Sequence, residues 1–184
     1  MKKINILILL LGFSLGICKA QTSKSNNLET HYNASDLVDF DLSSKGINVI
    51  TKAPKGARVI KDGNDIVVYG GKFFKITFSK QDFVNPFNED EKYESISEKV
   101  ADLKTVAGDI DMNPSFIKFE AEVKNGFLKR SKTGLTFVVG VKSGEAAIII
   151  TDGMSYDNSP DKFTKYSDED IKVMYEAAKA TLAK

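Results

Sequence analysis

The sequence predicts an α+β fold, in which antiparallel β-sheet in two hairpin-rich halves carries a central helix and a C-terminal helix packed on the sheet. Short runs of alternating apolar and polar residues, separated by Gly and Asn, indicate β-hairpins. Two other stretches repeat their apolar residues every three or four positions, as amphipathic helices do. The resulting order of strands, helix, strands and helix is typical of helices layered on an antiparallel sheet.

The first twenty residues have the pattern of an export signal. Lys2 and Lys3 precede the mostly apolar segment 4–17, and Cys18-Lys19-Ala20 places small residues where a signal peptidase cleaves. This apolar segment is shorter than the roughly 20 residues that span a bilayer, and no later segment approaches that length. We therefore predict that residues 1–20 are a signal peptide, that the protein is periplasmic or secreted, and that it has no transmembrane segment.

Cys18 offers an alternative, because a lipid anchor can be attached to a cysteine at the end of an export signal. Such attachment requires a small residue immediately before the cysteine, and here that residue is the large, β-branched Ile17. We therefore expect cleavage after Ala20 and no lipid anchor at Cys18. Cleavage there removes the single cysteine of the chain, so the mature protein is expected to be disulfide-free and without a thiolate nucleophile.

Residues 21–40 are predicted to be a flexible leader, because residues 21–35 are polar and lack apolar periodicity. Leu37, Phe40 and Leu42 are expected to dock its end onto the domain. Residues 41–184 are long enough to bury the core of a single α+β domain. The first half of this domain is expected to hold strands at residues 46–53, 57–61, 65–70 and 72–80.

The middle segment changes to a helical period. Its apolar residues follow one another at spacings of three and four, and Gly108 is placed to end the helix. The residues of this stripe are Tyr93, Ile96, Val100, Leu103 and Ala107. Further strands are then expected at residues 116–124, 127–132, 135–142 and 145–151, with a hairpin turn at Asn125-Gly126. The last two strands are apolar on both faces, which predicts a central position in the sheet.

A second helix is expected to close the chain. Ser167 is a favourable N-cap, and the three acidic residues that follow it suit the positive end of the helix dipole. The predicted core-facing stripe is Ile171, Met174, Tyr175, Ala178 and Leu182.

With these elements in place, the chain resembles the PsbP-like α+β sandwich superfamily. The resemblance covers about residues 41–183 and rests on the order of elements and on the segments "DLSSKGINVITKAPKGARV", "DIVVYGGKFFKITF" and "NEDEKYESISEKV". Members of that superfamily are mostly non-catalytic accessory or binding modules of photosystems and bacterial envelopes. The resemblance therefore implies no catalytic, cofactor-binding or metal-binding residues in this chain.

The residue content excludes several classes of site. The single histidine, His31, lies in the predicted leader. A Ser-His-Asp or Cys-His site is therefore excluded, because it needs a rigidly held imidazole. A catalytic zinc site is excluded as well, because it needs two or three ligating His or Cys. The net charge of +1 lacks the basic excess of a nucleic-acid binder. Paired carboxylates could still serve a glycosidase or lyase, but the chain has no Trp for sugar stacking.

Two further segments are candidate binding sites. Residues 109–120 match a calcium-binding loop at Asp109, Asp111, Asn113 and Glu120, but Pro114 stands where the loop needs Gly, so an ordinary connection is the favoured interpretation. The polar segment 152–170 is long for a connection between a strand and a helix. It is either a recognition loop or a loop held to the core by its aromatic residues.

These observations predict an exported, non-catalytic binding or accessory module of the bacterial envelope, with an unknown protein or small-molecule partner and no cofactor. The alternatives are a periplasmic carrier of a small apolar ligand and, third, an enzyme built on carboxylates.

Overall fold

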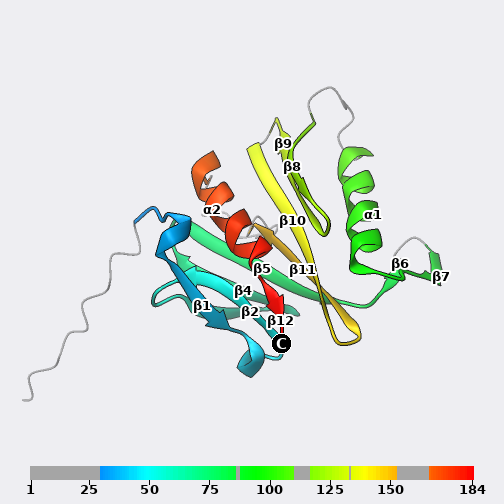
Figure 1. Ribbon diagram of the computed structural model, residues 1–184, viewed down its shortest axis with the longest axis horizontal. Coiled ribbons are helices and arrows are strands. Elements are labelled where there is room, and N and C mark those ends of the chain that lie inside the picture. The colour runs from blue at the N-terminus through cyan, green and yellow to red at the C-terminus, as the bar shows by residue number, and fades with distance from the viewer. Residues whose placement is uncertain (1–29, 86–87, 110–116, 133, 153–165) are drawn as a thin grey trace, which may run out of the picture.

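The computed structural model describes residues 30–85, 88–109, 117–132, 134–152 and 166–184 of the chain. The predicted signal peptide, residues 1–20 with Cys18, and the first part of the predicted leader lie outside these residues. Antiparallel sheets and two α-helices make up the described fold, which confirms the α+β class (Figure 1). No helix in the described ranges is long and apolar enough to cross a membrane.

The main sheet has seven antiparallel strands in the order β3-β4-β5-β11-β10-β9-β8. Their bounds are β3 (Arg58–Asp62), β4 (Asp65–Gly71), β5 (Phe74–Gln81), β8 (Lys118–Val123), β9 (Gly126–Ser131), β10 (Gly134–Ser143) and β11 (Ala146–Asp152). As predicted, the apolar strands β10 and β11 are interior strands of this sheet.

The two predicted sets of hairpins are not separate halves, because they join into this one sheet. β5, the last strand of the first set, pairs with β11, the last strand of the second, and Thr77 is opposite Thr151. The alternation of residues along each strand was visible in the sequence, but the pairing of the two sets depends on contacts between distant segments.

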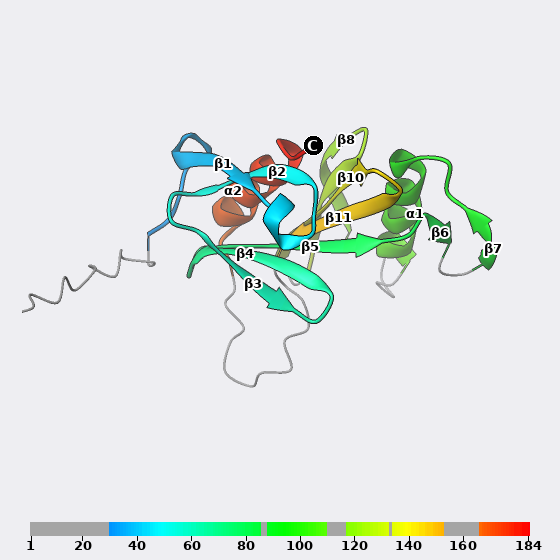
Figure 2. The ribbon, with the colours of Figure 1, turned by 90° about the horizontal axis from the view of Figure 1, so that it is seen from below.

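A second sheet of three strands contains β1 (Leu37–Asp41), β2 (Val49–Pro54) and the short C-terminal β12 (Leu182–Ala183), with β2 in the middle. Two short strands, β6 (Val84–Asn85) and β7 (Asn88–Lys92), form a separate pair. The three-stranded sheet and helix α2 (Asp168–Lys179) lie over the same side of the main sheet (Figure 2). Buried side chains from all three parts form one core between them.

Helix α1 (Ile96–Asp109) packs on the opposite face of the main sheet. Side chains on β11 show the division, because Ile148 and Ile150 join the core under α2 whereas Ala147 and Ile149 join a smaller core under α1. Ile96 and Val100 are buried there as the stripe predicted. Tyr93 is not part of the helix, and its hydroxyl instead donates a hydrogen bond to Asp102 at 2.6 Å.

The predicted start of α2 is confirmed. The Ser167 hydroxyl accepts a hydrogen bond from the Asp170 amide, and the Asp170 carboxylate accepts one from the Ser167 amide, which completes a capping box. The predicted stripe is wrong at its end, because α2 stops at Lys179 and Leu182 belongs to β12. Leu182 is 69% exposed instead of buried.

The fold also begins earlier than the predicted domain boundary at residue 41. Within the predicted leader of residues 21–40, a short 3₁₀ helix, η1 (Ala34–Asp36), is followed by β1, whose Leu37 is buried and opposite Pro54 of β2. Before η1, the Tyr32 hydroxyl donates a hydrogen bond to the Gly70 carbonyl at 2.7 Å. Docking through Leu37 is therefore confirmed, and the described part of the leader, from residue 30, belongs to the fold.

Candidate binding groove

The candidate site is an open groove of about 470 Å³ beside the outer end of β10, here called the β10 groove. Its lining consists of Ile96 at the start of α1, the β8–β9 turn at residues 123–125, residues 139–142 of β10, Lys179 of α2 and residues 181–183 at β12. The volume falls in the range of roughly 300–1,000 Å³ that is usual for ligand sites.

The groove exists because β10 is longer than its neighbour β9. Their pairing ends where Val139 lies opposite Gly126, and the Gly140 amide then donates to the Asn125 carbonyl at 2.7 Å. β10 continues to Ser143, where it pairs with β11 only, among the strands that the structure describes. Alternate residues of a strand direct their backbone groups to the same side, so the N–H and C=O of Lys142 point, like the Gly140 amide, into the groove.

Gly140 allows α1 to approach the floor of the groove. A Cβ atom at this position would lie 2.7 Å from both Ile96 Cγ1 and Val100 Cγ2, which is closer than carbon atoms pack. The absence of a side chain at Gly140 therefore sets the beginning of α1 directly against β10.

The C-terminal segment forms another wall. The Thr181 hydroxyl donates to the Thr51 hydroxyl at 2.8 Å, and both residues are buried. The Lys184 amide donates to the Asn48 carbonyl at 3.0 Å. These bonds hold β12 against β2, and they leave the Leu182 side chain exposed at the groove.

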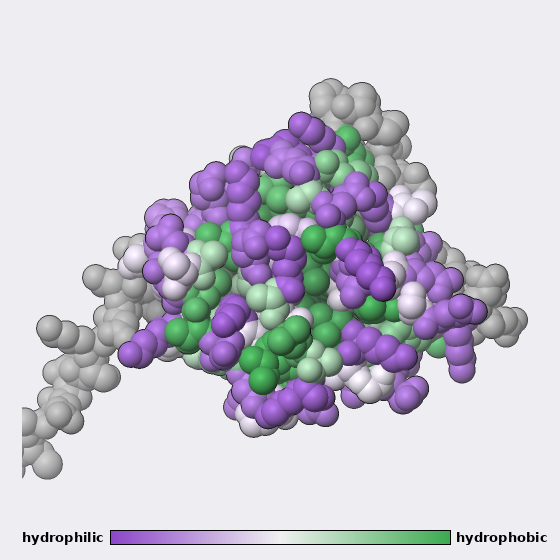
Figure 3. All heavy atoms as spheres, in the orientation of Figure 1, coloured by the Kyte–Doolittle hydropathy of each residue, from purple (hydrophilic) through white to green (hydrophobic). Residues whose placement is uncertain are grey.

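The groove exposes large apolar side chains to solvent. Val123 and Leu182 are two of the four large apolar side chains that are exposed within the described residues, at 44% and 69%, and both line this groove. Figure 3 shows hydrophobic residues gathered over β12 and along β10, with hydrophilic residues around them. Exposed apolar surface rimmed by polar residues is typical of interaction sites.

The charged residues that line the groove are all lysines, namely Lys124, Lys142 and Lys179. Lys179 forms an ion pair with Glu176 at 2.6 Å, and Lys142 lies over the Phe83 ring with its Nζ 5.4 Å from the ring centroid. No carboxylate is among the described residues that line the groove. The charged side chains that line the groove therefore carry only positive charge, although Glu176 offsets part of it at Lys179 and the net charge of the chain is only +1.

A second open hollow of about 460 Å³ shares Lys142 but has a different character. It is lined by residues 82–84 and 92–94 together with Glu145, so that acidic and basic side chains are mixed. Beside it, the buried Lys99 donates to the Asp82 carbonyl at 3.0 Å, and burial lowers the pKa of this lysine. Because the acidic and basic side chains of this hollow neutralise one another, the hollow is not suited to select a ligand of one charge.

Asp152 is the most perturbed carboxyl in the core. It is 5% exposed, and its Oδ2 atom has no hydrogen-bond partner among the described residues. Burial raises the pKa of Asp152 to about 7, against the opposing effects of the Phe137 and Asp152 amides and of the Lys129 charge. Burial, followed by the charges of Tyr69, Asp152 and Asp170, raises the pKa of Tyr166 to about 12. Neither Asp152 nor Tyr166 lines either hollow.

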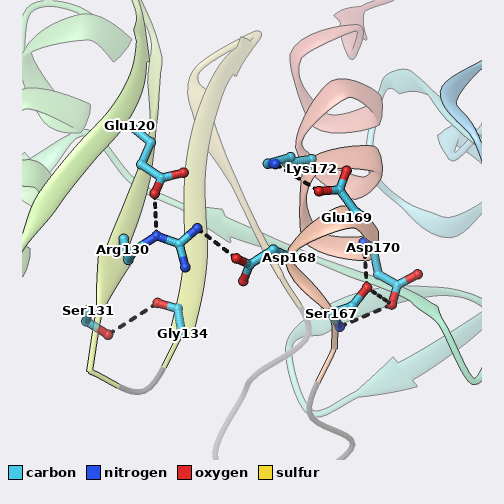
Figure 4. A network of polar contacts seen from close by, with 9 residues as sticks. All are labelled: Glu120, Arg130, Ser131, Gly134, Ser167, Asp168, Glu169, Asp170 and Lys172. Atoms are coloured by element: carbon cyan, nitrogen blue, oxygen red, sulfur yellow. Dashed lines mark hydrogen bonds and ion pairs between the residues drawn. The ribbon is translucent and has the colours of Figure 1, made fainter.

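A network of ion pairs ties the β8–β9 hairpin to α2 (Figure 4). The Arg130 guanidinium donates from Nε to Glu120 of β8 and from Nη2 to Asp168 of α2, the latter at 2.8 Å. The hydrogen bond from Arg130 lowers the pKa of Glu120. This network fixes the hairpin whose turn, at its far end, forms one wall of the β10 groove.

Few of the residues that the sequence singled out meet in a site. Glu120, the last position of the calcium-loop match, is paired with Arg130. The structure does not describe the side chain of Asp109, nor residues 110–116, which include Asp111 and Asn113. Within the described ranges, no three His, Cys, Asp or Glu side chains gather as a metal site. Most of the segment 152–170 also lies outside the described residues, so a recognition loop there stays a prediction.

His31 is held in place, contrary to its expected position in a flexible leader. Its Nδ1 atom is 2.7 Å from Oδ1 of Asp170, and its ring stacks on Phe73 with centroids 3.8 Å apart. The Ser167 hydroxyl also donates to Asp170, at 2.6 Å. Both residues thus bind the carboxylate, whereas in a nucleophilic triad the serine would bind the imidazole.

Comparison with family models, with curated proteins and with solved structures finds no match for this chain. The resemblance to the PsbP-like superfamily therefore stays a prediction. The β10 groove was not found from the sequence. A hairpin was predicted at this place, but its turn is Lys124-Asn125 and not Asn125-Gly126, because Gly126 is the first residue of β9 and pairs with Val123 of β8. The other components of the groove depend on how far β10 extends beyond β9 and on where β12 docks.

Proposed function

We propose that the protein is an exported, non-catalytic binding module of the bacterial envelope that holds a polypeptide partner in the β10 groove. The observation that carries the proposal is the end of β10 beyond Val139, which no described strand pairs on the β9 side and which lies at the bottom of an apolar groove. Backbone donors and acceptors lined up beside exposed apolar side chains are the features that bind a segment of polypeptide chain. The signal-peptide pattern of residues 1–20 supports the compartment, and the PsbP-like resemblance favours the same functional class.

The packing of the core favours this function over that of an apolar-ligand carrier. A carrier would hold its ligand between the sheet and the helices. In this protein the space under α2 is filled by side chains such as Phe74, Phe137 and Met174, each at most 1% exposed. The β10 groove, in contrast, is open to solvent, because Val123 and Leu182 in its lining are 44% and 69% exposed.

The position of the acidic residues favours binding over carboxylate catalysis. A carboxylate enzyme places an acid of raised pKa in an accessible cleft, beside a second acid that stays ionised. The carboxyl whose pKa is raised to about 7, Asp152, lies in the core and lines neither hollow.

Site-specific photo-crosslinking in the native host tests the proposal. A photoreactive phenylalanine analogue at position 182, in the groove, should crosslink a polypeptide, which mass spectrometry of the adduct would identify. The same analogue at position 60 is the matched control, because Ile60 is also an exposed apolar residue but lies on β3 at the other edge of the main sheet. Equal adducts at both positions, or none at 182 in a folded protein, would refute binding at the groove.

A further inference from the structure

We infer that the β10 groove takes an extended, acidic peptide segment, which adds to the main sheet as a strand beside residues 140–143 of β10. This inference rests on the proposed function and specifies the chemistry of the partner. It follows from three features of the groove: the direction of its backbone groups, the cover on both faces of the added strand, and the sign of its charge.

The backbone groups come first. The Lys142 N–H and C=O point into the groove, at the place that β9 would occupy if it did not turn at Asn125. An added strand can therefore accept a hydrogen bond from the Lys142 amide and donate one to its carbonyl. The pairing is short, so the side-chain contacts of the peptide must supply much of the binding energy.

Both faces of such a strand would be covered. On one face Ile96 of α1 lies against Gly140, and on the other, to which Val141 points, Leu182 of β12 also lines the groove. Because successive residues of a strand point to opposite faces, apolar residues at neighbouring positions of the peptide can both be buried. This arrangement distinguishes the groove from an ordinary strand edge, where one or both faces are open to water.

The charge specifies the rest of the peptide. Lys124, Lys142 and Lys179 line the groove, and no described acidic residue lines it with them. Lys142 alternates with Val141 along β10, whereas Lys124 and Lys179 lie on two other walls, so cations surround the apolar centre. A peptide with apolar residues in its middle and carboxylates toward its ends matches this pattern.

Binding of short synthetic peptides to the purified domain tests the inference. The probe is a fluorescein-labelled peptide EVTVTE, and its charge-reversed counterpart is KVTVTK. We expect fluorescence anisotropy to show at least about tenfold tighter binding of EVTVTE at low salt, with the difference reduced as salt is added. Equal affinity of the two peptides would overturn the acidic specificity.

Two modifications then test strand pairing. Methylation of both valine amides in EVTVTE removes backbone donors without changing the charge of the peptide. It should weaken binding about tenfold, because this factor corresponds to the free energy of one or two hydrogen bonds. On the protein, Lys142→Pro removes the amide that Lys142→Ala keeps, and both variants lack the lysine. Weaker binding to the Pro variant than to the Ala variant supports strand pairing.

Unchanged binding of the methylated peptide overturns strand addition, even if Lys142→Pro fails to fold. The two proposals can fail separately. If position 182 crosslinks a polypeptide but the peptides bind equally well, the proposed binding function is supported and the inference of an acidic added strand is refuted.

Discussion

The Nδ1 atom of His31 lies 2.7 Å from Oδ1 of Asp170, and this contact joins residues that are 139 positions apart in the chain. Asp170 is buried and also belongs to the capping box of α2, so the same carboxylate holds both the start of a helix and the N-terminal segment. The stacked Phe73 ring adds an apolar contact under the imidazole.

Replacement of His31 should therefore loosen the N-terminal segment before it affects the domain. We expect His31→Ala to increase amide hydrogen exchange at residues 31–36 and to lower the free energy of unfolding by about 1 kcal/mol. His31→Phe keeps a ring that can stack on Phe73 but has no nitrogen for Asp170, so it separates the two contacts. Exchange rates equal to the wild type in both variants would contradict the tether.

Asp152 should make stability depend on pH. Its pKa is raised from 3.8 in the unfolded chain to about 7 in the folded protein, so the stability that the protonated form provides is complete below pH 4 and is lost as pH rises through 7. The Asp152→Asn variant has no carboxyl at this position, so its stability should not fall in this way as pH rises. In urea titrations, we expect the free energy of unfolding of the variant, relative to that of the wild type, to be roughly 2–4 kcal/mol higher at pH 8 than at pH 4.

The exposed Asp62→Asn variant is the control for that series. Asp62 lies at the β3–β4 hairpin, so its replacement should leave the difference from the wild type constant across the same pH range. A constant difference for Asp152→Asn as well would show that Asp152 has no raised pKa in the folded protein.

Gly140→Ala should destabilise the packing of α1. The new methyl group would lie 2.7 Å from atoms of Ile96 and Val100, and overpacking of this kind costs about 1–3 kcal/mol. Val100→Ala removes one of the two obstructing groups. The double variant should therefore be more stable than the sum of the two single effects predicts, as measured by thermal unfolding. Strict additivity would show that α1 moves away freely.

Ser167→Ala should weaken the start of α2. The lost hydroxyl accepts from the Asp170 amide at 3.2 Å and donates to the Asp170 carboxylate at 2.6 Å. Loss of an N-cap serine costs about 1 kcal/mol, whereas glycine at the same position costs only a few tenths. Urea unfolding should thus rank the wild type first, Ser167→Gly second and Ser167→Ala last, and an alanine variant as stable as the wild type would contradict the capping role.

The sequence was sufficient to predict most strands and the start of α2, because period-two alternation and a capping serine are local signals. The sequence was misleading where the helical spacing of apolar residues continues beyond the end of the helix. Leu182 continues the spacing of α2, but the chain leaves the helix after Lys179 and pairs with β2. Tyr93 likewise fits the period of α1 and lies outside it.

The parts that could not be predicted depend on distant partners. The segment around His31 is polar and has no period, and its place in the fold comes from Asp170 and Gly70. The β10 groove has the same origin, because it appears only where β9 stops short of the end of β10 and where β12 docks nearby. The sequence shows each of these strands but not their relative register.

The pairing of β5 with β11 also determines the order of events during folding. As the chain is made from its N-terminus, β3, β4 and β5 can form their hairpins early, but β5 has no partner on its other side until β11 has been synthesised. Contacts between such distant segments slow folding, and an unpaired strand edge is prone to aggregate in the meantime. We therefore expect the core to be completed only after the last third of the chain, which holds β11 and α2, has been synthesised.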